Sequence, residues 1–170
     1  MADLKDVEAV ADAIKAELEA NLPSKLDAID VEKADQIVLE DVASYYVCDV
    51  SETPCYPFVL ILAEPTALAL ETQKSGQEDD RILVVVTVAN SEALNGESVE
   101  ETLFRKVART LRGIQEVLEE NPNLTSAGAA RVNWLRVMQK DYSPTGVVPE
   151  TGLYLKSGAL TISVRRFTQA

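Results

Sequence analysis

The feature that most constrains the fold is an apolar run that is followed closely by a well-marked helix. Residues 81–89 are mostly Ile, Leu and Val and contain neither Gly nor Pro, which predicts a strand with both faces covered. Further on, Ser98 and Glu101 have the spacing of a capping box, in which both side chains bind free backbone N–H groups at a helix start. Apolar residues then keep helical spacing up to Asn121-Pro122. This pattern predicts a strand and a long helix that packs on its sheet.

A second helix is predicted near the start of the sequence. Apolar residues recur in steps of three and four over residues 4–18, and charged residues lie between them. Pro23, with Asn21 before it, predicts the end of this helix, because proline removes a backbone donor and clashes with the preceding turn. The apolar stripe is narrow, so we expect the helix to lie outside the centre of the core or to form an interface with a neighbouring subunit. Residues 24–42 predict a short helix or an irregular connection.

Four further segments have the composition or the alternation of strands. They are residues 44–50, 58–63, 131–140 and 159–167. In the third, Trp134 is expected on one side together with Val132 and Met138, either in the core or as an interface anchor. In the fourth, Leu160, Ile162 and Val164 are expected on one face of the strand, and the residues between them on the other.

Two polar segments predict loops. Residues 72–80 are polar and acidic, which indicates an exposed, mobile loop. Residues 141–158 contain two Pro and three Gly, and loops of this length are usually functional or disordered. The order of elements therefore predicts one α+β domain over residues 1–170. It has an antiparallel or mixed β-sheet with the N-terminal helix and one long helix packed on one face.

Charge is distributed unevenly along the chain. The net charge is −12, and residues 1–80 hold nineteen Asp or Glu but only five Lys and no Arg. Residues 81–170 hold eleven basic and nine acidic residues, which indicates an acidic face and a mildly basic face. A net charge of this sign opposes unspecific binding to nucleic acid or to anionic membranes. The alternative interpretation is that the acidic half serves only solubility.

The residues that enzymes commonly use are sparse. The chain has no His, which excludes a Ser-His-Asp triad and a histidine metal site, and it has no phosphate-binding glycine motif. Cys48 and Cys55 match neither a zinc nor a redox spacing, so we expect two reduced thiols, with a local disulfide as the alternative. The acidic run Glu78–Asp80 is interpreted as a solvated charge run, with a divalent cation site as the alternative. We therefore expect no enzyme activity and no cofactor.

One basic pattern stands out on the long predicted helix. Arg105, Arg109 and Arg112 are four and three residues apart and so share one helix face. Three interpretations remain open for them and for Arg165 and Arg166: a solvated face paired with acidic neighbours such as Glu101 and Glu116, contacts between subunits, or DNA phosphate.

The order of these segments resembles the tail terminator and tail-completion proteins of tailed bacteriophages, including the Mu-like kind. The segments that carry the resemblance are Asn21-Leu22-Pro23, Ser44-Tyr45-Tyr46-Val47, Pro57-Phe58-Val59-Leu60-Ile61, Arg81-Ile82-Leu83-Val84-Val85-Val86 and Asn121-Pro122-Asn123-Leu124. The similarity extends over nearly the whole chain as a pattern of elements, and no single residue in it is diagnostic.

The resemblance implies a structural virion protein that forms a ring of six copies. Such a ring caps the tail tube, stops its polymerisation and offers a docking face to the neck or head, while DNA passes through the lumen. The implied partners are further copies of the chain, the tail tube protein and the neck or connector protein, with no membrane and no catalytic residue. The implied location is the tail–neck junction of the virion, after assembly in the host cytoplasm. The alternatives are a small-molecule-binding or regulatory module, and an enzyme that uses a metal at Glu78–Asp80.

Overall fold

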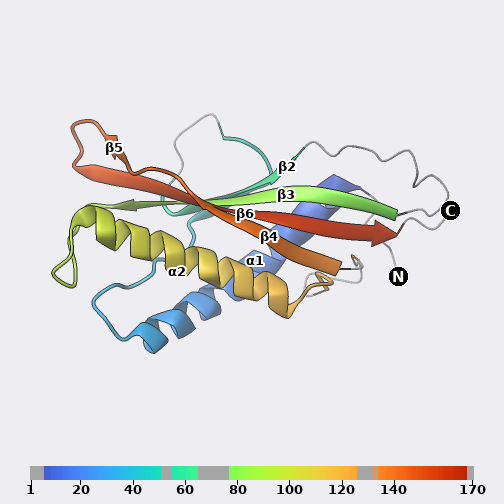
Figure 1. Cartoon of the computed structure of the whole chain (residues 1–170), viewed down its shortest axis with the longest axis horizontal. Coiled ribbons are helices and arrows are strands. Elements are labelled where there is room, and N and C mark those ends of the chain that lie inside the picture. Colours follow the sequence, from blue (N-terminus) through green and yellow to red (C-terminus); the bar gives the residue numbers. More distant parts are fainter. Residues whose placement is uncertain (1–5, 51–54, 65–76, 126–131, 133, 168–170) are drawn as a thin grey trace.

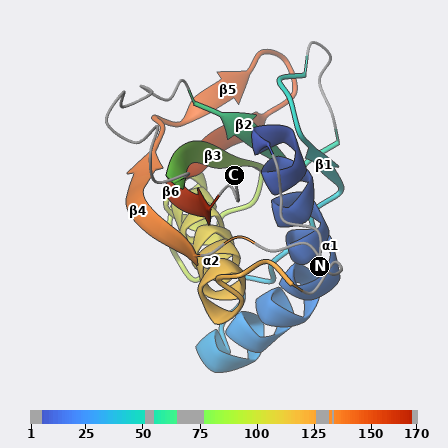
Figure 2. The same ribbon diagram turned by 90° about the vertical axis from the view of Figure 1, so that its right-hand side faces the viewer.

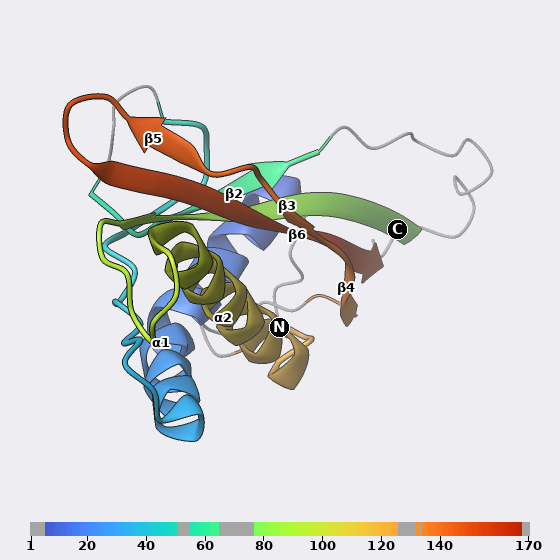
Figure 3. The same cartoon turned by 60° about the vertical axis from the view of Figure 1, so that its left-hand side comes forward.

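The computed structural model describes residues 6–50, 55–64, 77–125, 132 and 134–167. The elements are α1 (Val7–Lys33), β1 (Ser44–Tyr46), β2 (Phe58–Ala63), β3 (Gln77–Asn90), α2 (Val99–Glu120), β4 (Trp134–Tyr142), β5 (Gly146–Val148) and β6 (Leu153–Phe167). They form two layers, a twisted sheet and a pair of helices that lie together on one of its faces (Figure 1). Figure 3 shows both described helices beneath the sheet, on the same side of it. The predicted α+β fold is confirmed.

The six strands form one mixed sheet. The order is β1-β2-β3-β6-β4, and β5 pairs with β6 beyond the end of β4. Only β1 and β2 are parallel, and all other pairs are antiparallel. Buried aliphatic residues face each other across β3 and β6, such as Ile82 with Ile162 and Val84 with Leu160, and they point toward the helices. The predicted alternation of β6 is confirmed.

The expectation that both faces of β3 are covered is not met within the described chain. Ile82, Val84 and Val86 are fully buried on the helix side, whereas Leu83 and Val85 on the other side are only half-buried. Side chains alternate between the two faces of a strand. A continuous apolar run therefore predicts that both faces of the strand are apolar, but it does not predict what covers each face.

Helix α1 continues through Pro23, so the predicted end at that residue is wrong. A proline inside a helix costs about 3 kcal/mol. Next to it, Asn21 and Ser24 bind backbone carbonyl groups of the preceding turn with their side chains. Beyond it, Leu26 and Ile29 are buried, and burying such a side chain contributes roughly 1.5–3 kcal/mol. Tertiary packing thus outweighs the local cost.

Helix α1 is also more central than its narrow stripe predicts. Val10, Ile14, Leu18 and Leu22 have no exposed surface and belong to the main core cluster. The two helices approach closely at Gly113 of α2, where a Cβ atom would lie 3.0 Å from Leu26 Cδ2. The expectation that the helix lies outside the centre of the core is therefore wrong. A narrow apolar stripe is enough to bury α1, because Gly113 lets the two helices approach closely.

Helix α2 agrees with its prediction. The Ser98 hydroxyl accepts from the Glu101 N–H, and the Glu101 carboxylate accepts from the Ser98 N–H, which completes the capping box. The helix ends at Glu120 with Asn121 as its cap. Among the described residues, no helix has the length and hydropathy that crossing a bilayer requires.

Two predicted loops contain strands. Gln77–Asp80, expected in an exposed loop, opens β3 and pairs with the end of β6. Residues 72–76 lie outside the described part of the chain. The expected loop at 141–158 holds the end of β4, all of β5 and the start of β6, because these segments form antiparallel pairs with one another. The strand near residue 131 begins at Trp134, and a register shift between Val137 and Gln139 interrupts its alternation.

Candidate functional site

The predicted arginine face of α2 forms a row of intramolecular ion pairs. Arg105 binds Glu97, and Arg109 binds both oxygens of Asp35 in the segment after α1. Arg112 binds Glu32 at the end of α1 and also Glu116 on its own helix. Of the two acidic neighbours expected from spacing, Glu116 is such a partner, while Glu101 caps the helix instead. The row therefore attaches the end of α1 to α2, and a contact with another subunit at these arginines stays a prediction.

These pairs shift the pKa values of their carboxyl groups. The hydrogen bond from Arg112 lowers the pKa of Glu32 from 4.5 to about 2. The hydrogen bond from Arg109 likewise holds the pKa of Asp35 well below its usual range. A carboxyl group whose pKa is lower in the folded state binds fewer protons there than in the unfolded chain. It therefore stabilises the fold above the unfolded pKa and ceases to do so as the pH falls.

We expect the stability of the protein to fall between about pH 4.5 and pH 2 because of these groups. Arg112→Gln should flatten this fall, because the variant loses the hydrogen bond that is the largest cause of the lowered Glu32 pKa. Urea unfolding at pH 7, 4, 3 and 2 measures it, with Lys15→Gln as a control that removes a cation outside the row of ion pairs. An unchanged pH profile in Arg112→Gln would show that other carboxyl groups cause the acid sensitivity.

Arg165 and Arg166 lie on opposite faces at one end of the β3–β6 pair. Arg165 Nε donates to Asp79 Oδ1 at 2.7 Å, and its guanidinium carbon lies 4.8 Å from the centre of the Trp134 ring. Arg166 donates to Asp80 on the helix side, where Arg166 is 4% exposed and Asp80 is 7% exposed. Asp79 and Asp80, which the sequence analysis considered as ligands of a divalent cation, thus form ion pairs with arginines. The side chain of Glu78 lies outside the described part of the structure.

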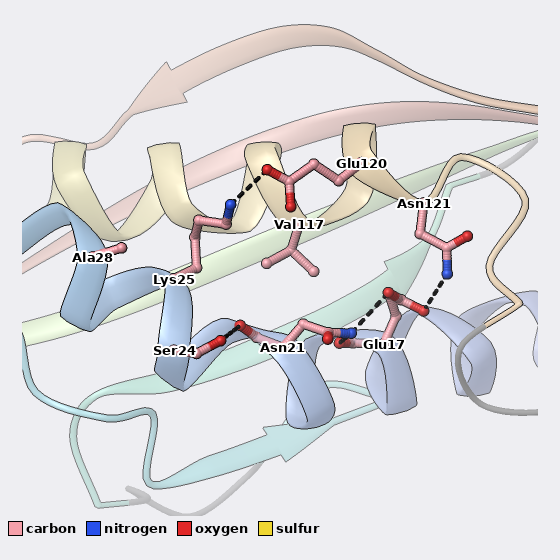
Figure 4. Close-up of a pocket in the computed structure, with 8 residues that line it drawn as sticks. All are labelled: Glu17, Asn21, Ser24, Lys25, Ala28, Val117, Glu120 and Asn121. Atoms are coloured by element: carbon pink, nitrogen blue, oxygen red, sulfur yellow. Dashed lines mark hydrogen bonds and ion pairs between the residues drawn. The ribbon is translucent and has the colours of Figure 1, made fainter.

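A polar pocket of about 220 Å³ lies between the middle of α1 and the end of α2 (Figure 4). Its base is the buried Glu17, whose Oε1 accepts from Asn21 Nδ2 at 2.9 Å and whose Oε2 accepts from Asn121 Nδ2 at 2.8 Å. At the other end, Lys25 binds Glu120 across the two helices. The polar groups of the pocket thus bind each other and join α1 to the C-terminal cap of α2. Sequence reasoning missed Glu17, which no local pattern separates from its exposed acidic neighbours.

We expect Glu17→Gln to lower the free energy of unfolding by about 1–3 kcal/mol. The new amide turns one acceptor into a donor, which then opposes the donor group of Asn21 or Asn121. Urea unfolding at neutral pH measures the change. Glu19→Gln is the matched control, because Glu19 is exposed and its one ion pair among the described residues is with Lys15, at 3.9 Å. Equal effects of the two substitutions would exclude a special role for Glu17.

The face of the sheet away from the helices is the second candidate site, called here the open sheet face. Its half-buried centre is formed by side chains of β2, β3 and β6: Leu60, Leu62, Leu83, Val85, Thr87, Ser157, Ala159, Thr161 and Ser163. Toward one end, side chains of β3, β6 and β4 continue the same face: Asp79, Arg81, Trp134, Arg136 and Arg165. The β2–β3 side is aliphatic, and the β6 strip consists of small residues. The open face of an antiparallel sheet is usually polar. An aliphatic open face is typical of a surface that another molecule covers.

The remaining candidates lie apart from these sites. Trp134 is on the open sheet face beside Arg165, whereas Leu135 points into the core, so the expected grouping of Trp134 with Val132 is wrong. Val132 lies before the start of β4, so the alternation of the strand does not extend to it. Cys48 and Cys55 are both exposed free thiols.

No family model and no curated protein matches the chain in sequence.

Proposed function

We propose that the chain is a structural subunit that assembles with further copies into a ring and ends a bacteriophage tail tube. The observation that carries this proposal is the open sheet face. Both helices pack on one side of the sheet, and the other side presents Leu60, Leu62, Leu83 and Val85. A sheet of this kind gains stability when another surface covers it, because burying apolar area contributes about 25 cal/mol per Å².

The edge formed by β4 and β5 supports the same function. Among the described strands, none pairs with the outer edge of β4, so its backbone groups are available to a partner strand. Met138, Tyr142 and Val147 are exposed along this edge. An open edge with exposed apolar side chains is typical of strands that pair between subunits.

The proposed place of this ring is the junction between the tail tube and the neck of the virion. The resemblance to tail terminators rests on the order of a helix, strands, a long helix and two strands around a long loop, and the chain has this order with the short β5 within that loop. The proposed partners are the tail tube protein on one side of the ring and the neck or connector protein on the other. A net charge of −12 suits a ring through which DNA passes without binding, since phosphate contacts require basic groups.

Negative-stain electron microscopy of the purified protein tests this function, alone and with tail tube protein. We expect rings with a central hole, and tubes that stop growing when the ring is bound. Sedimentation at high protein concentration gives the mass of the assembly. A single monomeric species under all these conditions, with tube growth unaffected, would contradict the proposal.

The pocket between α1 and α2 favours a second candidate function, the binding of a small polar molecule. Lys25 and Glu120 supply opposite charges at its rim, which suits a zwitterionic metabolite. This candidate has weaker support, because these charges already bind each other. A thermal shift with zwitterionic metabolites that disappears in Lys25→Ala would support it, and no shift with any of them would exclude it.

A further inference from the structure

The open sheet face contains one row of side chains that holds two arginines and no acid. Strand register arranges this face in rows that cross β3, β6 and β4. The first row is Asp79, Arg165 and Trp134, and it contains its own carboxylate. The next row is Arg81, Ser163 and Arg136, in which a hydroxyl lies between two cations.

Arg81 and Arg136 are available to a partner. Both are exposed, and neither side chain makes a hydrogen bond or an ion pair with any other described residue. Glu64 lies beside Arg81 through a backbone hydrogen bond, yet no ion pair joins the two. Since neighbouring strands are about 4.8 Å apart, the two arginine backbones are separated by about 10 Å. Two long cationic side chains at this separation can bind two carboxylates at once.

Helix α1 presents a matching pair of acids. Glu8 and Asp12 are exposed in its first turns, and within the described part of the chain neither has a partner. Residues four apart on a helix are neighbours, with about 5–6 Å between their Cβ atoms. The pair therefore offers two carboxylates in one line along the helix.

The two pairs lie toward opposite sides of the molecule. β4, which carries Arg136, ends the strand order on one side, and β1 ends it on the other. α1 packs beside β1 and β2, away from β4 (Figure 2). Surfaces of opposite charge on opposite sides of one subunit allow each copy to bind the next in the same way. Such head-to-tail contacts form a closed ring when the rotation between copies permits it.

We propose that Arg81 and Arg136 bind Glu8 and Asp12 of a second copy of this chain. The inference rests on the proposed self-assembly and adds to it the contact that joins neighbouring copies. Arginine suits this contact because its planar guanidinium binds carboxylates through two hydrogen bonds. The contact is electrostatic and lies near the surface, so it weakens as salt is added.

Charge reversal tests the contact by sedimentation equilibrium at low salt. Arg81→Glu with Arg136→Glu should weaken self-association at least about 100-fold, since like charges across an interface cost several kcal/mol. Glu8→Lys with Asp12→Lys should do the same. All four substitutions in one chain should restore association, because each surface then meets its new complement. Asp27→Lys with Asp49→Lys is the control for the acid reversal, since it raises the net charge by the same amount at exposed residues elsewhere. Circular dichroism checks that each variant folds.

The outcomes separate this inference from the proposed function. The inference fails and the proposed function stands in two cases. In the first, the wild-type protein assembles and neither charge reversal weakens its self-association. In the second, the variant with all four substitutions does not associate. If the wild-type protein never associates, both fail. If it associates through this contact but leaves tail tube growth unaffected, the inference stands and the tail function fails. Binding of a DNA duplex that is lost in Arg81→Glu with Arg136→Glu would assign the row to phosphate and overturn the inference.

Discussion

Replacing Asp80 with Ala should lower the free energy of unfolding by about 3–5 kcal/mol, the usual cost of breaking a buried ion pair by removing one partner. Asp80 and Arg166 are almost fully buried on the helix side of the β3–β6 pair. The variant removes the carboxylate that accepts from Arg166 Nε, in a place where water cannot readily replace it. Urea unfolding at neutral pH measures the loss.

Two further variants separate the ion pair from other causes. Asp79→Ala changes the adjacent residue of the same type, whose pair with Arg165 is partly exposed, and should cost only about 0–1 kcal/mol. Asp80→Leu with Arg166→Met replaces both charges by apolar groups and should regain much of the stability. Equal losses at Asp79 and Asp80 would contradict the distinction between the two faces of this strand end.

Leu26→Ala should lower the free energy of unfolding by about 2–5 kcal/mol, because it creates a cavity between the two helices. Leu26 is 1% exposed, and its Cδ2 atom occupies the space that Gly113 leaves free. The prediction addresses the part of α1 beyond Pro23, which sequence reasoning did not place in the long helix. Thermal and urea unfolding measure the change.

Val31→Ala is the control for this prediction, since Val31 lies in the same part of α1 and is 80% exposed. It should change stability by no more than about 0.5 kcal/mol. A loss below 1 kcal/mol for Leu26→Ala would mean that the end of α1 contributes little to the core. The packing described around Gly113 would then be wrong.

The parts of the fold that sequence reasoning predicted are those that local physics decides. The capping box at Ser98 needs only residues three positions apart, and the strand Phe58–Ala63 and the alternation of Leu160 and Ile162 are local as well. The failures are decided at long range. Pro23 is tolerated because distant residues bury the helix beyond it. Asp80 lies in a strand, where Arg166, 86 residues away, donates a hydrogen bond to its carboxylate.

The candidate sites follow the same division. Spacing along α2 placed Arg105, Arg109 and Arg112 on one face. The partners that Arg109 and Arg112 meet, Asp35 and Glu32, lie in another part of the chain. The row of Arg81, Ser163 and Arg136 depends on the pairing of three strands that no local signal specifies. The sequence therefore identified the charged residues of these sites, but it could not predict which of them come together from distant parts of the chain.

The position of β6 in the sheet has a consequence for how the molecule is made. β6 lies between β3 and β4, yet it follows every other element in chain order. On the ribosome, β3 and β4 therefore emerge without the strand that joins them, and contacts such as that between Thr87 and Ser157 span 70 residues. Pairing at such separation is slow, and unpaired strand edges aggregate while they wait. The nascent polypeptide therefore exposes the edges of β3 and β4 until β6 is translated, which raises its tendency to aggregate during synthesis.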